Sequence, residues 1–198
     1  MLIPHLVTRC RDFGFCTPYA SHLACLAVCA KVSFSSLQQA AHVKEVLFMQ
    51  MILWRHAEAD DNYHRDLSRE LTPKGHRQAQ TTARWLHKYL PDDYLLVSSQ
   101  ASRAKQTAQY LSKPLIDARF NPGSRVNQVE HALKLLLNTH ARPIVLVAHQ
   151  PFLGQVASLF VHCDCRSQPV KKSAIYWLKS RGDSWYYKAI LPPKLMKG

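Results

Sequence analysis

The pattern of hydrophobic and polar positions changes character at about Met49. After that point, short continuous apolar runs alternate with longer segments in which apolar residues recur every three or four positions. Runs such as 51–54 and 144–148 are typical of strands buried on both faces, and the longer segments are typical of helices with one apolar side. This alternation predicts a layered α/β fold.

The first helix has the clearest boundaries in the sequence. Thr72 is a good N-cap residue, and the proline that follows it is favoured at the first helical position. An apolar face then continues to the residue before Pro91, through Ala79, Ala83, Leu86 and Leu90. The pattern predicts a helix over Pro73–Leu90.

The other predicted elements follow in regular order. They are strands at Met51–Trp54, Tyr94–Ser98 and Ile144–Ala148, helices at Ala101–Leu111, Val126–Asn138 and Pro151 to about Val161, an extended piece at Pro114–Ala118, and a closing strand pair at Ala174–Lys179 and Trp185–Ile190. Helical crossovers between strands predict a mostly parallel central sheet flanked by helices, in a three-layer sandwich.

Residues 1–48 show neither a helical nor a strand period and are left unassigned, so the predicted domain is 49–198. One hypothesis is that the functional protein starts at Met49, because Lys44-Glu45-Val46 can be encoded by a ribosome-binding sequence. The alternative is a secretory signal around the apolar stretch Leu23–Ala30.

Composition narrows the classes of function. The 198 residues are 47% hydrophobic and 20% charged, which argues against disorder, and no apolar run approaches the roughly 20 residues needed to span a membrane. Twenty-six Lys and Arg against 13 Asp and Glu give a net charge of +13. Such a charge attracts anions, namely nucleic acid, acidic proteins or phosphorylated substrates.

The six cysteines do not have the spacing of a zinc site, and Cys163 and Cys165 lie too close together for the usual pair of thiolate ligands. We therefore expect no metal and no cofactor. Free or buried thiols would suit the cytoplasm.

Polar residues follow three of the predicted strands. They are Arg55-His56, Ser98-Ser99 with Arg103 a little further on, and His149. In open α/β sheets ligands bind at the carboxyl ends of strands, and two predicted helices also begin there. Singly, each His or Arg is more simply a structural or surface residue, but together they predict an anion site with an imidazole nucleophile.

Phosphoryl transfer is the chemistry that suits this combination. A Walker loop, a GxGxxG turn and paired metal-binding carboxylates are all missing from the sequence, which argues against nucleotide kinases and two-metal mechanisms.

Three ordered motifs resemble the histidine phosphatase superfamily, also called phosphoglycerate mutase-like. They are Leu53-Trp-Arg-His-Ala-Glu-Ala59, Ser98-Ser-Gln-Ala-Ser-Arg-Ala-Lys-Gln-Thr-Ala108 and Val145-Leu-Val-Ala-His-Gln-Pro-Phe-Leu-Gly154. A further segment, Asp66-Leu-Ser-Arg-Glu-Leu-Thr-Pro-Lys-Gly75, resembles the SixA-type phosphohistidine phosphatases. The resemblance extends from Met49 to about Pro193 and implies a phosphoglycerate mutase-like fold.

The resemblance also implies roles for individual residues. His56 would be the nucleophile, Arg55, Arg103 and Arg69 would bind phosphate, and His149 would complete the pocket. Asn62 falls where mutase-like members keep a phosphate-contacting Asn, although it is more simply a turn residue.

Two features depart from the superfamily. Ala57 replaces the glycine of the signature, and no clear catalytic acid emerges. The candidate carboxylates are Glu58, Asp66, Asp117 and Glu130. The interval between Arg103 and His149 is too short for the cap insertions of larger members. An open pocket without a strong acid favours a substrate with a good leaving group.

The sequence therefore predicts a cytoplasmic, metal-independent phosphatase with a phosphohistidine enzyme intermediate. The expected substrate is a phosphorylated histidine on a partner protein, such as the His-containing domain of a phosphorelay. Small phosphomonoesters or pyrophosphates are the alternative. A non-catalytic module that binds phosphate or nucleic acid is the rival from another class, based on the basic, aromatic C-terminal segment, but strand alternation explains those aromatics more simply.

Overall fold

The structure is a computed structural model that describes residues 49–61, 66–163 and 167–196. The predictions for residues 1–48 and for Asn62 lie outside this part of the chain. Among the described residues, no helix has the length and apolar character needed to cross a membrane.

Six strands form one sheet in the order β3-β2-β4-β1-β5-β6. Their bounds are β1 Gln50–Arg55, β2 Leu95–Ser98, β3 Leu115–Ile116, β4 Ile144–Ala148, β5 Ile175–Arg181 and β6 Ser184–Leu191. Neighbours among β3, β2, β4 and β1 run parallel, whereas β5 is antiparallel to β1 and to β6. The mostly parallel sheet that the sequence predicts is confirmed.

In the described part of the chain, four α-helices cover the sheet, with short 3₁₀ helices between elements. They are α2 Pro73–Tyr89, α3 Ser102–Gln109, α4 Val126–Thr139 and α5 Phe152–Phe160, with η1 Asp66–Ser68, η2 Ala118–Phe120 and η3 Pro193–Leu195. The predicted helix at Ala101–Leu111 is shorter at both ends. Thr72 caps α2 as expected, since its side chain accepts a hydrogen bond from the Gly75 N–H at 3.0 Å.

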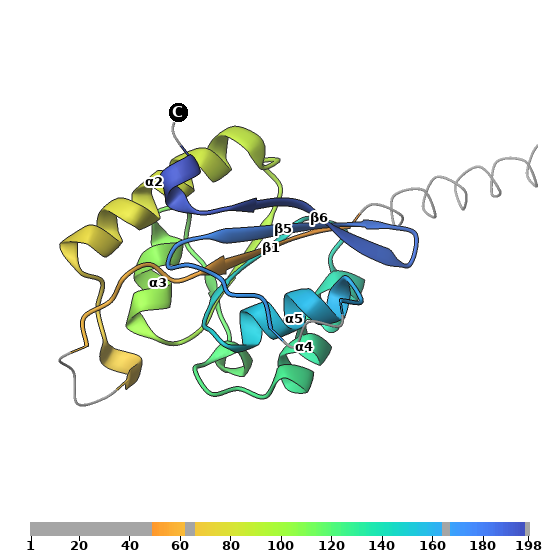
Figure 1. Cartoon of the computed structure of the whole chain (residues 1–198), viewed down its shortest axis with the longest axis horizontal. Helices are drawn as coiled ribbons and strands as arrows, with labels where there is room; N and C mark the ends of the chain where they lie inside the picture. The colour runs from red at the N-terminus through yellow and green to blue at the C-terminus, as the bar shows by residue number, and fades with distance from the viewer. Residues whose placement is uncertain (1–48, 62–65, 164–166, 197–198) are drawn as a thin grey trace, which may run out of the picture. The chain divides into compact units, whose positions relative to one another are not determined.

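Two buried clusters lie on opposite faces of the sheet, which makes the three-layer sandwich. On β1, Met51 and Leu53 pack with α4 and α5, and Ile52 and Trp54 pack with α2 and α3. Figure 1 shows α4 and α5 on one side of the sheet and α2 on the other. Successive side chains of a strand point to opposite faces, so the continuous apolar runs reflect burial on both faces.

The register of the central strands places their carboxyl ends together. Arg55 lies opposite Ala148 in the β1–β4 pair, and Ser98 lies opposite Val147 in the β2–β4 pair. The residues that follow these three strands therefore emerge at one edge, where the His56 N–H donates to the Ala148 carbonyl at 3.0 Å.

Most aromatics near the C-terminus belong to the core. Tyr176 and Trp177 are buried. Trp185 and Tyr187 are partly buried and pack against the core cluster that contains residues of α4 and α5. This fits strand alternation and leaves Tyr186 as the exposed ring of the group. Cys163 is disulfide-bonded, so the expectation of a free thiol at this position is wrong.

Candidate active site

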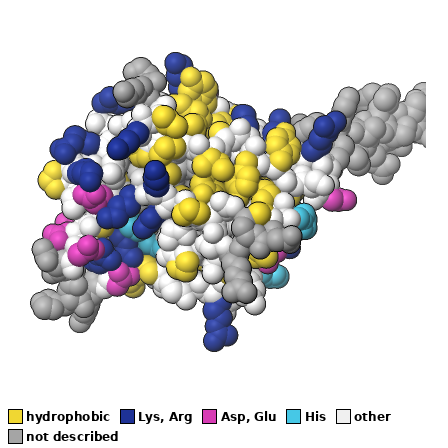
Figure 2. All heavy atoms as spheres, in the orientation of Figure 1, with side chains coloured by type: hydrophobic (Ala, Val, Ile, Leu, Met, Phe, Trp, Pro, Cys, Tyr) yellow, Lys and Arg dark blue, Asp and Glu magenta, His cyan; other side chains and the backbone are white. Residues whose placement is uncertain are grey.

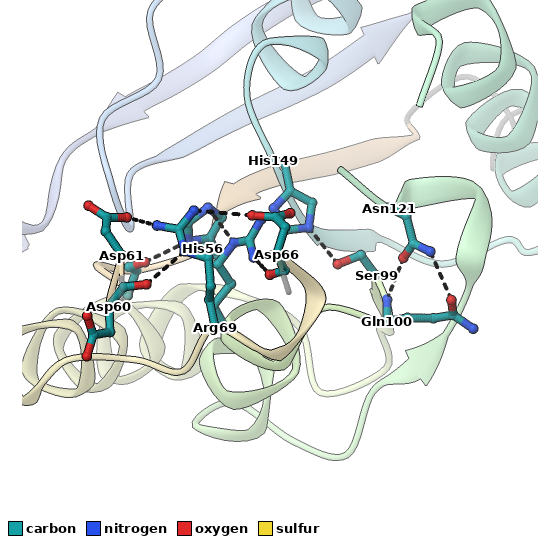
Figure 3. Close-up of polar contacts among 11 residues, drawn as sticks. His56, Asp60, Asp61, Asp66, Arg69, Ser99, Gln100, Asn121 and His149 are labelled. Atoms are coloured by element: carbon teal, nitrogen blue, oxygen red, sulfur yellow. Dashed lines mark hydrogen bonds and ion pairs between the residues drawn. The ribbon is translucent and has the colours of Figure 1, made fainter. Parts of the chain in front are cut away.

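A cavity of about 440 Å³ lies at the carboxyl ends of β1, β2 and β4. Its lining includes all five residues predicted from the sequence, namely Arg55, His56, Arg69, Arg103 and His149. The structure therefore brings together side chains that are up to 94 positions apart in the chain. Figure 3 shows His56, Asp66, Arg69 and His149 converging from separate segments.

His56 directly follows β1 and is only 8% exposed. Its Nδ1 lies 2.7 Å from the carbonyl oxygen of Ala57, and an oxygen of that kind can only accept, so Nδ1 carries the proton. Nε2 then has a free lone pair, and it accepts a hydrogen bond from Arg103 Nε at 3.4 Å. Both contacts require the same neutral tautomer.

Burial keeps this imidazole uncharged. The pKa of His56 is lowered to about 3, first by burial and then by the charges of Arg103, Arg55 and Arg69, although the bond to Ala57 acts in the opposite direction. At neutral pH the ring is an unprotonated base at Nε2, which is the state that a nucleophile needs.

His149 follows β4 and is 2% exposed. Its Nε2 lies 2.7 Å from Ser99 Oγ, and its ring centroid is 5.0 Å from that of His56. Burial, followed by the charges of His56 and Arg103, lowers the pKa of His149 to about 2. Its Nδ1 is buried and has no hydrogen-bond partner among the described residues, so this atom has hydrogen-bonding capacity to spare.

Arg103 and Arg69 already hold one anionic group between them. The Asp66 carboxylate accepts hydrogen bonds from Arg103 Nη2 at 2.9 Å and from Arg69 Nη1 at 3.2 Å. Arg103, which is 4% exposed, also donates through Nη1 to the Asp66 carbonyl at 2.5 Å. Two guanidinium groups so placed suit a tetrahedral anion with several oxygen acceptors.

Backbone carbonyls also accept hydrogen bonds from the guanidinium groups of Arg69 and Arg55. Arg69 Nε donates to the Asp60 carbonyl at 2.7 Å, and its Nη2 is ion-paired with Asp61. Arg55 Nη1 donates to the Val170 carbonyl at 2.7 Å. These contacts orient both guanidinium groups at the wall of the cavity.

The start of α2 packs against the segment that follows His56. A Cβ at Gly75 would lie 1.9 Å from the Glu58 carbonyl oxygen, so only glycine allows this approach. The Thr72 N–H donates to the same carbonyl at 3.0 Å. The Leu-Thr-x-x-Gly motif therefore has a structural role, since it holds the loop that carries the nucleophile.

None of the four candidate carboxylates is placed as a strong acid. Hydrogen bonds with Lys74 at Glu58 and with Arg119 at Asp117 lower the pKa of each carboxyl. Neither Asp117 nor Glu130 lines the cavity.

Asp66 lines the cavity but is ionised. Burial raises its pKa, but hydrogen bonds and charges from Arg103 and Arg69 outweigh this effect, so the net shift is downward.

Sequence reasoning missed several lining residues, among them Asp61, Pro122, Gln150 and Lys172. Gln150 directly follows His149, so its position was a usable signal. Lys172 comes from a segment before β5 that carries no motif. Among the described residues, no group of three or more His, Cys, Asp or Glu is arranged to hold a metal ion.

Two neutral histidines and several arginines thus line a cavity at the carboxyl edge of the sheet, an arrangement that suits the binding of an anionic phosphoryl group. The model of the Histidine phosphatase superfamily (branch 1) matches residues 51–123 of this chain.

Two SixA proteins resemble the chain. The phosphohistidine phosphatase SixA homolog of Haemophilus influenzae is 25% identical over 125 residues, covering 56% of this chain and 76% of the relative. The structure of the protein histidine phosphatase SixA complexed with tungstate superimposes with a TM-score of 0.65 at 23% identity, over 75% of this chain and all of that one.

The same fold is found in a phosphatase with a different named substrate. A phosphoserine phosphatase variant from Entamoeba histolytica in complex with phosphoserine gives a TM-score of 0.59 at 15% identity, over 72% of this chain and 96% of that one. The predicted phosphoglycerate mutase-like fold is therefore confirmed.

Proposed function

We propose that this protein is a metal-independent phosphatase that removes the phosphoryl group from a phosphohistidine on a partner protein. One observation carries the proposal. The buried His56 is held with its proton on Nδ1, and its Nε2 lone pair faces a cavity lined by three arginines.

In the first step, His56 Nε2 attacks the phosphorus atom. A new P–N bond forms while the P–N bond of the substrate breaks, and the electron pair and a proton from solvent go to the leaving imidazole. Arg55, Arg69 and Arg103 bind the phosphoryl oxygens and stabilise the charge of the transition state.

In the second step, water attacks the phosphorus of the phosphorylated His56. The P–N bond to Nε2 breaks, inorganic phosphate leaves and the neutral ring is restored. The free Nδ1 of His149 is available to a phosphoryl oxygen in both steps, because nothing in the described part of the chain occupies it. The Ala57 carbonyl holds the Nδ1 proton of His56 throughout.

The choice of substrate rests on the leaving group and on access to the site. The Asp66 carboxyl in the cavity has a lowered pKa and is ionised, and a phosphohistidine needs less acid assistance than an alkyl phosphate does. The interval between Arg103 and His149 is taken up by α3, β3, η2, α4 and β4, so it supplies no insertion to cover the cavity. The similarity to two proteins named as phosphohistidine or protein histidine phosphatases supports the same choice.

Trapping of the intermediate tests the mechanism. Brief mixing of the protein with ³²P-labelled phosphohistidine peptide should leave acid-labile, alkali-stable label on the wild type and none on His56→Ala. His131→Asn, at an exposed position on α4, is the matched control and should label normally. Turnover by His56→Ala at near the wild-type rate would overturn the mechanism.

The substrate is tested separately, with wild-type protein and three phosphorylated probes. Faster hydrolysis of the phosphohistidine peptide than of phosphoserine or pyrophosphate supports the proposal. The reverse order would assign the site to small phosphorylated molecules. Binding of oligonucleotides without any turnover would favour a non-catalytic module.

A further inference from the structure

A second cavity, the basic groove, adjoins the proposed active site. It has a volume of about 720 Å³, and its lining includes Arg55, Lys74, Arg77, Lys171, Lys172 and Lys194. Arg55 and Lys172 also line the phosphate cavity, so the two cavities share a wall. Figure 2 shows Lys and Arg side chains gathered around the group of histidine atoms on the left of the view.

Most of the positive charge of the basic groove is not neutralised by the residues that the structure describes. Glu58 is the acidic residue of its lining, and its carboxylate is ion-paired with Lys74 at 2.9 Å. Arg77, Lys171 and Lys194 are exposed and form no ion pair with the described residues. Like charges gathered without counterions are unfavourable in isolation and attract an anionic partner.

Three distant segments build the groove, and the core holds them in place. Arg77 lies on α2, Lys171 precedes β5, and Lys194 lies on η3. Met196, just after η3, is buried in the same cluster as Leu86 of α2, so the wall formed by η3 is fixed to α2. The packing of the core therefore fixes the position of the groove wall that η3 forms against α2.

We propose that the basic groove docks an acidic surface of the partner protein that lies beside its phosphohistidine. This inference rests on the proposed function, because it places the partner next to the phosphate that the adjoining cavity holds. Docking there would bring the phosphoryl group to His56 and speed association by electrostatic steering.

The chemistry of the groove favours protein carboxylates over other anions. Four of its six cations are lysines, which are separate point charges rather than the planar forks that clamp phosphate groups. Pro192 and Pro193 give it an apolar wall, which suits a protein surface. None of its lining residues in the described part of the chain is aromatic, so these residues supply no rings on which nucleic acid bases could stack.

Two synthetic peptides test the proposal. Each carries one histidine phosphorylated by phosphoramidate, flanked either by four glutamates or by four glutamines. We expect wild type to have a kcat/KM about tenfold higher for the glutamate peptide at low ionic strength, and we expect added salt to reduce that preference.

The groove variant is R77Q/K171Q/K194Q, which leaves the two shared residues intact. The matched control is R84Q/K88Q/K113Q, which removes the same number and kind of charges from positions that line neither the phosphate cavity nor the basic groove. Rates are divided by each protein's rate on nitrophenyl phosphate. The glutamate preference should fall to about twofold in the groove variant and persist in the control.

Binding is measured in parallel by fluorescence anisotropy, with the full chain carrying His56→Ala, so that docking is separated from turnover. No preference for the glutamate peptide, or a preference that survives in the groove variant, overturns the docking proposal. If neither peptide is hydrolysed but the groove-dependent preference in binding remains, the proposed function fails and the docking surface stands. Loss of oligonucleotide binding in the groove variant, with the peptides unaffected, would assign the groove to nucleic acid.

Discussion

Arg103 Nε donates a hydrogen bond of 3.4 Å to Nε2 of His56, so a proposed phosphate ligand contacts the proposed nucleophile directly. The bond is longer than the usual 2.7–3.2 Å and leaves the lone pair weakly engaged. The same guanidinium binds Asp66 through its two Nη atoms. Arg103 thereby orients the nucleophile and holds an anion at the same place.

Replacement of Arg103 should therefore be costly for turnover. Arg103→Ala is expected to lower kcat/KM for phosphohistidine peptide by about 2–4 kcal/mol of transition-state stabilisation, the range for losing one preorganised donor. Arg103→Lys should recover only part of this, because lysine lacks the planar fork. Arg119→Ala, which removes an exposed arginine paired with Asp117, is the control. Equal rates for Arg103→Ala and wild type would contradict the assignment.

Ser99 is expected to position His149 rather than to touch the substrate. Its hydroxyl lies 2.7 Å from His149 Nε2, and without it that nitrogen would be buried and unpaired, which costs about 1–3 kcal/mol. Ser99→Ala should therefore lower the affinity for vanadate about tenfold, because the ring no longer keeps its orientation. Ser98→Ala is the matched control, since Ser98 is also buried but its hydroxyl donates to the Ser99 carbonyl. Unchanged vanadate affinity in Ser99→Ala would show that packing alone orients His149.

The strand and helix order could be predicted because most elements carry strong local patterns. The run at 144–148 coincides with β4, and α2 begins at the predicted Pro73. The short η1, η2 and η3 were missed, since three residues show no period. Helix ends were less accurate, as at α3, because capping there involves no side-chain hydrogen bond.

Some residues of the candidate site could likewise be predicted from the sequence, and others could not. The strand-end rule and the motifs indicated His56, Arg103 and His149, whose positions depend on the register of parallel strands. Lys172 and the basic groove could not be found, because they depend on how the segments before β5 and after β6 pack against α2. That packing is a tertiary property that no local pattern encodes.

The two buried histidines should make the free energy of unfolding fall as the pH is lowered from 7 to 5. Burial lowers their folded pKa values to about 3 and about 2, and an unfolded histidine titrates near 6.5. Below pH 6.5 the unfolded chain binds protons that the folded chain does not, so stability declines with the pH, by about 2 kcal/mol per histidine at pH 5.

Urea unfolding at several pH values measures this loss. His149→Gln should flatten the decline, and the exposed His131→Gln should reproduce the wild-type curve. A decline of equal slope in His149→Gln and wild type would contradict the prediction, since it would show that the pKa of His149 is the same in the folded and the unfolded chain.

The last prediction concerns the leaving group and Asp66, the carboxylate that lines the cavity next to Arg103. Its pKa is lowered, because hydrogen bonds and charges from Arg103 and Arg69 outweigh the effect of burial, so it is ionised and has no proton to donate at neutral pH. Hydrolysis should therefore depend on leaving-group quality, with phosphohistidine and nitrophenyl phosphate as good substrates and alkyl monoesters as poor ones. Asp66→Asn should retain phosphohistidine turnover and bind vanadate a few-fold more tightly, since a like charge is removed from the anion site. Asp93→Asn, in the exposed pair with Arg142, serves as the control. Efficient hydrolysis of an alkyl phosphate that collapses in Asp66→Asn would instead identify Asp66 as the acid and move the protein to small phosphomonoesters.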